Sequence, residues 1–183
     1  MKDPKNSILI PIDIQKGFDN LKFGPRNNPG FEKNIESLFR TWRRLGGDII
    51  HVRHDSRNPD SLLKEGKVGF GFKNEALPID GESIITKHVH SAFIGTELLK
   101  ILEQFNAPQL YFCGITTDHC VSTSVRMASD YGFDTTLIYD CCATFDRYTK
   151  DKRRIDAQLV HDSAISSLDG EFCRVAVYSE IFK

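Results

Sequence analysis

Three side chains that could cooperate in covalent hydrolysis lie far apart in the sequence, namely Asp13, Lys87 and Cys120. Each follows a short apolar run typical of a buried strand, and the carboxyl ends of parallel strands meet at one edge of a sheet, where ligands bind. A thiol could serve as nucleophile, a carboxylate as acid and base, and an ammonium group as the nearby positive charge. Each residue alone has a simpler explanation, since Asp13 could cap a helix, Lys87 could be a solvated strand end and Cys120 could pack a helix start. Their agreement on one sheet edge favours a covalent hydrolase.

Cys120 lies in the most informative segment of the chain, Gly114-Ile115-Thr116-Thr117-Asp118-His119-Cys120-Val121. The pattern predicts a strand before this segment and a helix after it, with Cys120 in the first helical turn. Free backbone N–H groups and the helix dipole at such a position lower the pKa of a thiol from roughly 8.5 toward roughly 7. We therefore expect an activated cysteine.

The elements that must position these residues can be read from the hydrophobic pattern. Short apolar runs predict strands at residues 7–13, 48–53, 83–87, 110–114, 135–140 and 173–178, and helical spacing predicts helices at 31–45, 95–105 and 152–168, besides the one that holds Cys120. Apolar strands that alternate with helices indicate a mainly parallel, Rossmann-like sheet covered on both faces. We expect one domain, residues 1–183, of the three-layer α/β/α class.

One interval breaks this alternation. Residues 54–82 are rich in Gly, Pro, Asn and Asp and show no strong period. Connections of this length are often functional lids. The interval could fold over the site or meet a neighbouring subunit, and a plain surface excursion is an equal alternative.

The composition excludes several classes of function. The 183 residues are 40% hydrophobic, and 24 basic against 25 acidic residues leave a net charge of −1, so we expect no nucleic-acid partner and no membrane partner. The five cysteines show no C-x-x-C spacing, which favours reduced thiols in a reducing compartment. The polar stretch at residues 1–7 lacks a secretory apolar region, so we expect a cytoplasmic protein.

Taken together, these residues resemble the isochorismatase-like cysteine hydrolase superfamily, which includes nicotinamidases and related amidases. The resemblance depends on three anchors in this order: Asp13-Ile14-Gln15 with Phe18, Lys87 followed by Ser91-Ala92-Phe93, and the segment 114–121 around Cys120. It covers most of the chain and implies the isochorismatase-like fold.

The resemblance implies a catalytic triad of Asp13, Lys87 and Cys120. It also implies a cis peptide bond between Ile115 and Thr116, with the backbone N–H groups of Thr116 and Cys120 forming an oxyanion hole. The substrate-binding residues that we carry over are Gln15, Phe18, His54, Phe93 and Thr117. The aromatic residues expected near the site are Phe18, Phe23, Phe93 and Phe145. For each of them, a place in the core or at a subunit interface is as good an explanation as a pocket role.

The metal site of nicotinamidases has no counterpart in this sequence. That site uses an Asp-x-His pair after the second strand and a further histidine, whereas the matching segment here reads His51-Val52-Arg53-His54-Asp55-Ser56. No histidine lies between Asp55 and Lys87 to complete a ligand set. We therefore expect no metal and no other cofactor, and the resemblance is to the metal-free branch of the family.

The function that we expect is cleavage of a C–N bond in a small amide, carbamoyl or ureido substrate through a thioester, by an amidohydrolase of the EC 3.5.1 type. The first alternative is an isochorismatase that hydrolyses a vinyl ether, but Cys120 argues against it because members with that activity replace the cysteine. The second alternative is a non-catalytic binding or scaffold member. The partners that we expect are a small-molecule substrate and further copies of the chain, in a dimer or tetramer.

Four other residues carry weaker expectations. His161 is expected on the surface of a helix. Asp118 is expected to cap the helix that holds Cys120, with a role in the pocket as the alternative. His119 is expected to face away from the sulfur because adjacent helical residues point in different directions. Arg147 could reach a carboxylate on the substrate.

Overall fold

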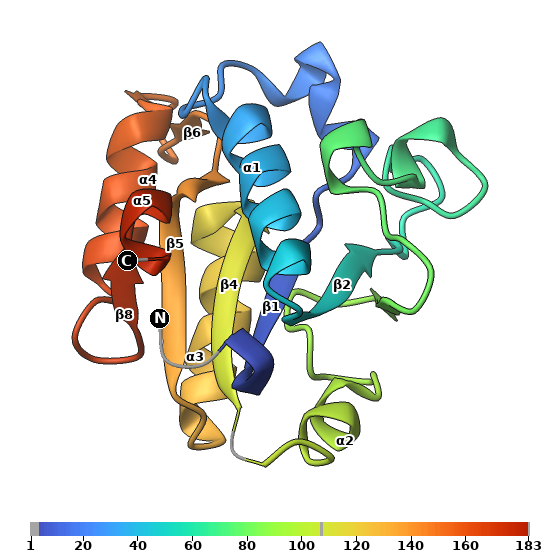
Figure 1. Ribbon diagram of the computed structural model, residues 1–183. Coiled ribbons are helices and arrows are strands. Elements are labelled where there is room, and N and C mark those ends of the chain that lie inside the picture. The colour runs from blue at the N-terminus through green and yellow to red at the C-terminus, as the bar shows by residue number, and fades with distance from the viewer. Residues whose placement is uncertain (1–3, 107, 183) are drawn as a thin grey trace.

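The protein is built on one six-stranded sheet in which every neighbouring pair of strands is parallel (Figure 1). The computed structural model describes residues 4–106 and 108–182. The strand order is β3-β2-β1-β4-β5-β8, with bounds β1 Ser7–Ile12, β2 Asp48–His54, β3 Ser83–Lys87, β4 Gln109–Ile115, β5 Thr135–Ala143 and β8 Arg174–Ala176. β1 and β4 are buried along their whole length, because helices cover both faces of the sheet. The predicted parallel sheet is confirmed.

Helices on both faces make the three-layer arrangement that the pattern predicted. The helices are α1 Phe31–Arg44, α2 Leu98–Leu102, α3 Ser122–Asp130, α4 Ala157–Ser166 and α5 Tyr178–Ile181. In Figure 1, α1 and α5 cover the near face of the sheet and α3 covers the far face. The buried face of α1 carries Phe31, Ile35 and Leu38, spaced by three or four positions as in an amphipathic helix.

The strand order reverses between β1 and β4. From β1 the chain proceeds to β2 and β3 on one side, whereas β4, β5 and β8 extend the sheet on the other side. A ligand site in an open parallel sheet lies at such a reversal, beyond the carboxyl ends of the two strands. Asp13 follows β1, and the turn that carries Cys120 follows β4.

β1 and β4 approach each other unusually closely at Gly114. A Cβ atom on Gly114 would lie 2.0 Å from the carbonyl oxygen of Ile12, and its φ of +130° is one that other residues rarely adopt. Only glycine therefore allows the two strands to run side by side up to the start of the segment that carries Cys120.

Three predicted helices differ from the structure. The helix expected at 95–105 is shorter, because Gly95 has a φ of +70° and α2 begins only at Leu98. The helix expected at 152–168 begins at Ala157, because β7 (Arg154–Ile155) pairs with β6 (Arg147–Tyr148) in a small antiparallel hairpin before it. Cys120 lies in a π-helical turn, Thr117–Val121, and α3 follows this turn directly, beginning at Ser122.

The last strand is also shorter than expected. β8 covers three residues of the predicted stretch 173–178. The backbone N–H of Tyr178 donates to Oδ1 of Asp140 over 2.7 Å, and α5 begins at Tyr178. The chain therefore leaves the sheet before the apolar run ends.

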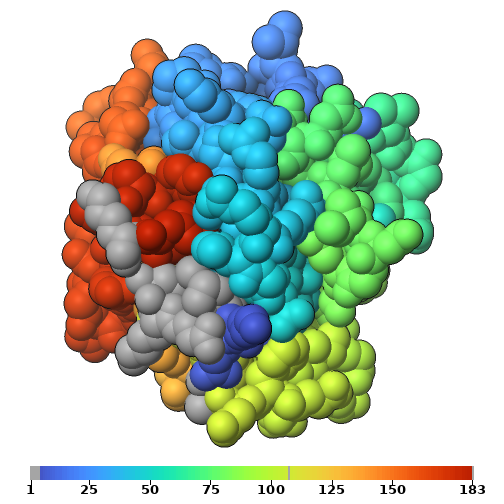
Figure 2. Space-filling model, in the orientation of Figure 1, coloured from blue at the N-terminus to red at the C-terminus, as the bar shows by residue number. Residues whose placement is uncertain are grey.

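The long interval between β2 and β3, residues 55–82, packs onto the rest of the domain and will be called the lid. It contains two short 3-10 turns, Val68–Phe70 and Asn74–Ala76, and it buries Phe70 and Phe72. In Figure 2 the green segment lies against α1, and Arg43 of α1 donates to the carbonyl oxygen of Leu77 over 2.8 Å. None of the helices in the described residues is long and apolar enough to cross a membrane.

Candidate functional site

Asp13 and Lys87 form a buried ion pair at the carboxyl edge of the sheet. The side chain of Asp13 is 1% exposed and that of Lys87 is 0% exposed, and Nζ of Lys87 donates to Oδ2 of Asp13 over 2.7 Å. Two charges removed from water in this way are tolerated because each has the other as its partner. The structure thus brings together two residues that lie 74 positions apart in the sequence.

The backbone of Asp13 holds its carboxylate in place. The chain takes a left-handed φ of 52° at Asp13, a conformation that costs free energy for a non-glycine residue and often occurs at functional sites. The backbone N–H of Asp13 donates to the carbonyl oxygen of Val52 over 2.8 Å. Oδ1 of Asp13 is buried and accepts no hydrogen bond from the residues that the structure describes. This oxygen therefore retains its capacity to take a proton.

The thiol of Cys120 lies beside both charged groups, but its pKa moves in the direction opposite to our expectation. Burial, followed by the negative charge of Asp13, raises the pKa of Cys120 to about 12, although Lys87 acts to lower it. The expected activated thiolate is therefore wrong for the free protein. The free protein holds a neutral thiol next to a carboxylate that can accept its proton.

Cys120 and Asp13 open into a cavity of about 210 Å³. The lining residues are Asp13, Phe18, Phe23, His54, Leu63, His90, Thr116, His119, Cys120, Phe145 and Arg147. The rings of Phe18, Phe23 and Phe145 form an aromatic wall on it, with centroids 5.0 to 6.0 Å apart. A cavity of this size suits a small molecule rather than a peptide or polymer.

The polar part of the cavity lining carries little net charge. The guanidinium group of Arg147 donates to Asp118 through Nε over 2.8 Å and through a terminal nitrogen over 3.0 Å. Burial alone would raise the pKa of Asp118, but hydrogen bonds from Arg147 and Thr144 lower it below the usual value. Asp118 therefore pairs with Arg147 instead of capping the helix, and the predicted cap is wrong.

Some of the predicted site residues line the cavity and others do not. The cavity is lined by Phe18, by His54, and by Thr116 and Cys120, the two residues whose backbone N–H groups are expected to form the oxyanion hole. The peptide bond between Ile115 and Thr116 is cis, as the resemblance implied. His119 also lines the cavity, and its Nε2 lies 3.4 Å from a carboxylate oxygen of Asp118.

The other three predicted substrate-binding residues do not line this cavity. The side chain of Gln15 donates to the carbonyl oxygens of His54 and Phe70 over 3.0 and 2.9 Å, so it fastens the end of β2 and the lid to the segment after Asp13. The ring of Phe93 packs against Tyr131. Thr117 is buried.

The hydroxyl group of Thr117 lies 2.8 Å from Nδ1 of His161, which comes from α4. His161 is only 1% exposed, and the surface position predicted for it is wrong. Burial lowers the pKa of His161 to about 4, so the ring is neutral near neutral pH. α4 thereby contacts the turn that carries Cys120 through one buried polar pair.

Two cavity residues were not expected from the sequence. Leu63 comes from the lid and His90 from the loop after β3, and neither segment has a hydrophobic period that could place a side chain. His90 follows Lys87 in an H-x-H pair, a signal too weak to indicate a site.

A metal-binding cluster does not occur among the described residues: no three His, Cys, Asp or Glu side chains lie close enough to share an ion. The carboxylate of Asp55, at the end of β2, is paired with Nζ of Lys64 at 2.9 Å instead. The expectation of a metal-free site stays a prediction.

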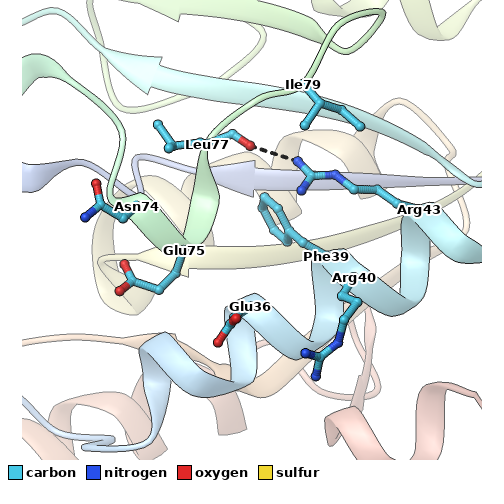
Figure 3. Close-up of a pocket in the computed structure, with 8 residues that line it drawn as sticks. All are labelled: Glu36, Phe39, Arg40, Arg43, Asn74, Glu75, Leu77 and Ile79. Carbon is cyan, nitrogen blue, oxygen red and sulfur yellow. Dashed lines mark hydrogen bonds between the residues drawn. The ribbon is translucent and has the colours of Figure 1, made fainter.

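A larger hollow of about 420 Å³ lies elsewhere, between α1 and the lid (Figure 3). Its lining includes Glu36, Phe39, Arg40, Arg43 and Glu75. The guanidinium group of Arg43 donates hydrogen bonds to the carboxylate of Glu82 and to the carbonyl oxygen of Leu77. This hollow contains no nucleophile, so we assign the chemistry to the smaller cavity at the sheet edge.

Comparison with known proteins places this geometry in a family. The sequence model of the isochorismatase domain matches residues 7–169. The isochorismatase family protein YrdC of Bacillus subtilis (strain 168) is 39% identical over 177 residues, which cover 97% of this chain and 95% of YrdC.

A crystal structure from Chromobacterium violaceum, assigned to the hydrolases of the isochorismatase family, superposes with a TM-score of 0.92. It is 39% identical and covers 99% of this chain and 93% of its own. Ureidoacrylate amidohydrolase RutB of Cronobacter sakazakii is 29% identical over 115 residues, which are 62% of this chain and 44% of RutB.

Proposed function

Because the chain belongs to the isochorismatase family of hydrolases, we propose that it hydrolyses the C–N bond of a small amide, carbamoyl or ureido substrate through a thioester on Cys120. The observation that carries this proposal is the cluster of Asp13, Lys87 and Cys120 at one end of a small cavity. A nucleophile, a proton acceptor and a fixed positive charge are the parts that covalent amide hydrolysis needs.

The first half of the proposed reaction begins from the neutral thiol. As the sulfur of Cys120 attacks the carbonyl carbon of the substrate, its proton passes to the carboxylate of Asp13. Lys87 keeps its hydrogen bond to Oδ2 of Asp13, which leaves Oδ1 to take the proton. Transfer during the attack avoids forming a free thiolate, which burial makes costly.

The tetrahedral intermediate places a negative charge on the former carbonyl oxygen. We assign its stabilisation to the backbone N–H groups of Thr116 and Cys120, two residues that line the cavity. One donor of this type typically contributes about 2.7–4 kcal/mol to the transition state. Asp13 then returns its proton to the departing nitrogen, the C–N bond breaks, and the amine or ammonia leaves.

The second half releases the acyl group. A water molecule gives one proton to Asp13 and its oxygen attacks the thioester carbon. The C–S bond breaks, the sulfur of Cys120 takes the proton back, and the carboxylic or carbamic acid leaves. The same carboxylate thus serves as acid and base in turn.

The proposed substrate class has two supports. The cavity of about 210 Å³, with its aromatic wall, fits a small molecule. The relative RutB is named as an amidohydrolase, and its substrate as ureidoacrylate. The particular amide that this protein takes is open to a screen of amides, ureides and carbamoyl compounds.

The test measures ammonia release across that screen, with the wild-type protein and two cysteine variants. We expect activity on at least one compound, none in Cys120→Ala, and retained activity in Cys173→Ala. Cys173 is a matched control because burial raises its pKa to about 12 as well, but it lies outside the cavity. Full activity in Cys120→Ala would show that the thioester route is wrong.

A further inference from the structure

The ammonium group of Lys87 lies within hydrogen-bonding distance of three oxygen and nitrogen atoms, and it also acts on the thiol of Cys120. Nζ donates to Oδ2 of Asp13 over 2.7 Å and to the carbonyl oxygen of Val89 over 3.1 Å, and it lies 3.3 Å from Nδ1 of His54. An ammonium group has three N–H donors and no acceptor. In its contact with the ring of His54, Lys87 can therefore only be the donor.

This contact determines which nitrogen of His54 carries the proton. Because Lys87 can only donate, Nδ1 of His54 must present its lone pair. A neutral imidazole then carries its hydrogen on Nε2. The side chain of Gln15 holds the backbone of His54 at two points. The backbone N–H of His54 donates to Oε1 of Gln15 over 2.9 Å, and the carbonyl oxygen of His54 accepts from Nε2 of Gln15 over 3.0 Å. The orientation of the ring is thus fixed from its backbone and from Nδ1.

The ring of His54 remains neutral near neutral pH. Burial, followed by the positive charge of Lys87, lowers the pKa of His54 below its usual value, although Asp13 acts to raise it. A second proton on Nδ1 would also set two donors against each other at 3.3 Å. His54 lines the cavity beside Cys120, so the part of its ring that is left for a ligand includes the Nε2–H donor.

The surroundings determine what this donor can bind. The charged groups of the site form two ion pairs, Asp13–Lys87 and Asp118–Arg147, so their net charge is close to zero. The Lys87 ammonium, on the Nδ1 side of the ring, makes Nε2–H a better donor and repels any cation that approaches it. The site therefore favours an uncharged acceptor atom, such as a carbonyl oxygen or an unprotonated ring nitrogen.

We propose that His54 is a substrate-binding residue whose Nε2–H holds a neutral hydrogen-bond acceptor of the substrate. This inference rests on the proposed function and narrows it: the enzyme acts on small uncharged amides that carry such an acceptor beside the scissile carbonyl, in preference to cationic amides. A ligand that leaves this donor without an acceptor should bind more weakly, because a buried polar group without a hydrogen-bond partner costs free energy.

The test uses two variants that keep different halves of the imidazole. In His54→Asn the amide oxygen can accept from Lys87 as Nδ1 does, but the Nε2 donor is lost. In His54→Gln the amide N–H can reach the Nε2 position, but the Nδ1 acceptor is lost. The probes are benzaldehyde and the three pyridine carboxaldehydes at mildly alkaline pH, where pyridine nitrogens are unprotonated. Each aldehyde adds reversibly to Cys120: its carbon bonds to the sulfur and the thiol proton ends on the former carbonyl oxygen.

The quantity measured is the Kd of each aldehyde, from protection of Cys120 against iodoacetamide. A pyridine ring makes an aldehyde more reactive in any site, so the comparison is between proteins. We expect the ratio of the benzaldehyde Kd to that of the tightest pyridine isomer to fall about fivefold in His54→Asn and to be kept in His54→Gln.

Three other outcomes overturn the inference in distinguishable ways. A ratio that falls in His54→Gln but not in His54→Asn would mean that His54 only holds Lys87. A ratio unchanged in both variants would mean that the ring touches no ligand. If no aldehyde protects Cys120 even in the wild-type protein, the proposed nucleophile is wrong and the role of His54 is rejected with it.

Discussion

Cys120 shows how two opposing effects on one thiol are decided by burial. The turn at a helix start lowers the pKa of a cysteine in an exposed position, and that reasoning predicted a thiolate. In the structure, loss of water around the sulfur and the charge of Asp13 outweigh the help of Lys87, and the pKa rises to about 12. The reactivity of Cys120 therefore depends on its neighbour as a base and not on a pre-formed thiolate.

Asp13→Asn tests this dependence. We expect kcat to fall about 10²- to 10⁴-fold because the proton acceptor is gone. We also expect the pKa of Cys120 to fall, because the carboxylate that raises it is removed while Lys87 remains. The pH dependence of iodoacetamide alkylation measures that pKa, and Asp118→Asn, which removes a carboxylate that does not act on the thiol, is the control.

The same substitution leaves Lys87 buried without its counter-ion, which costs about 3–5 kcal/mol of stability in comparable pairs. A thermal melt will show whether the variant is folded at the assay temperature. A folded Asp13→Asn protein with wild-type turnover would rule out Asp13 as the base.

His161 provides a prediction on acid stability. Its pKa is about 4 in the folded protein, against 6.5 for an exposed histidine, so below pH 6.5 the unfolded chain binds more protons than the folded one. Stability is therefore complete above pH 6.5 and is lost as the pH falls, by about 3 kcal/mol between pH 7 and pH 4 from this group. Urea unfolding at several pH values should show this slope in the wild-type protein and its loss in His161→Gln.

A second histidine serves as the control for that experiment. His88 has a side chain that is 50% exposed, so His88→Gln should keep the steep part of the pH dependence. An equal slope in the wild-type and His161→Gln proteins would show that His161 is not held neutral by the fold.

At the scale of elements, the lid is held to the segment after β1 by a contact between two glycines. A Cβ atom on Gly69 would lie 2.4 Å from the carbonyl oxygen of Leu62 and 2.9 Å from Cα of Gly17. A Cβ atom on Gly17 would lie 2.6 Å from a methyl group of Leu63. Leu63 lines the cavity, so the spacing of these glycines determines where the lid places that side chain.

Gly69→Ala should push the lid away from the segment after β1. We expect a loss of about 1–3 kcal/mol in unfolding free energy from the steric overlap, and a fall in kcat/KM of about ten- to hundredfold because Leu63 and its neighbours are displaced. Gly71→Ala is the matched control two residues away, where an added Cβ meets nothing nearer than the carbonyl oxygen of Val68 at 3.5 Å. If both variants behave like the wild-type protein, the lid is not held by this contact.

The strands and the ends of strands could be predicted from the sequence because each depends on local pattern. β1 and β4 are buried on both faces and read as continuous apolar runs, and the rule for parallel sheets then brings Asp13 and Cys120 to one edge. The burial of His161 could not be predicted in this way. α4 leaves Leu159 61% exposed and buries His161, because the ring of His161 pairs with the hydroxyl group of Thr117 in the turn that carries Cys120.

The lid marks the other limit of prediction. Its position is determined by side-chain contacts between segments distant in the chain, such as Gln15 with Phe70, and by the fit of Gly69 on Gly17. None of these contacts leaves a period in the sequence. A cavity residue such as Leu63 is therefore visible only once the fold is known.

For the molecule as a whole, a network of four charges joins the lid, the segment after β1 and α1. Lys73 of the lid, only 4% exposed, donates to Asp19 and to Glu32 at the start of α1, the latter over 2.9 Å. Arg26 donates to both oxygens of Glu32 over 2.7 Å, and its backbone forms a bridge to Phe145 of the aromatic wall. The network thus connects the outer frame of the domain to the cavity.

Glu32 is the centre of this network, and its titration should reveal the strength of the connection. Burial alone would raise its pKa, but hydrogen bonds from Arg26 and Lys73 lower it to about 2, from 4.5 in an exposed carboxyl. The stabilisation is therefore present above pH 4.5 and is lost as the pH falls toward 2. We expect Glu32→Gln to unfold with about 2 kcal/mol less free energy at pH 7, since it gives up charged hydrogen bonds, and the deficit to shrink through that window of pH.

Glu36→Gln provides the comparison that separates this network from general charge effects. Glu36 lies on the same helix one turn later and is exposed, so its loss should change the unfolding free energy by no more than about 0.5 kcal/mol. Because Glu32 also holds the lid through Lys73, its variant should in addition raise the KM of the amide that the screen identifies, whereas Glu36→Gln should not. A Glu32→Gln deficit that stays constant from pH 7 to pH 2, or an equal deficit in Glu36→Gln, would mean that these charges act independently and do not connect the lid to the domain.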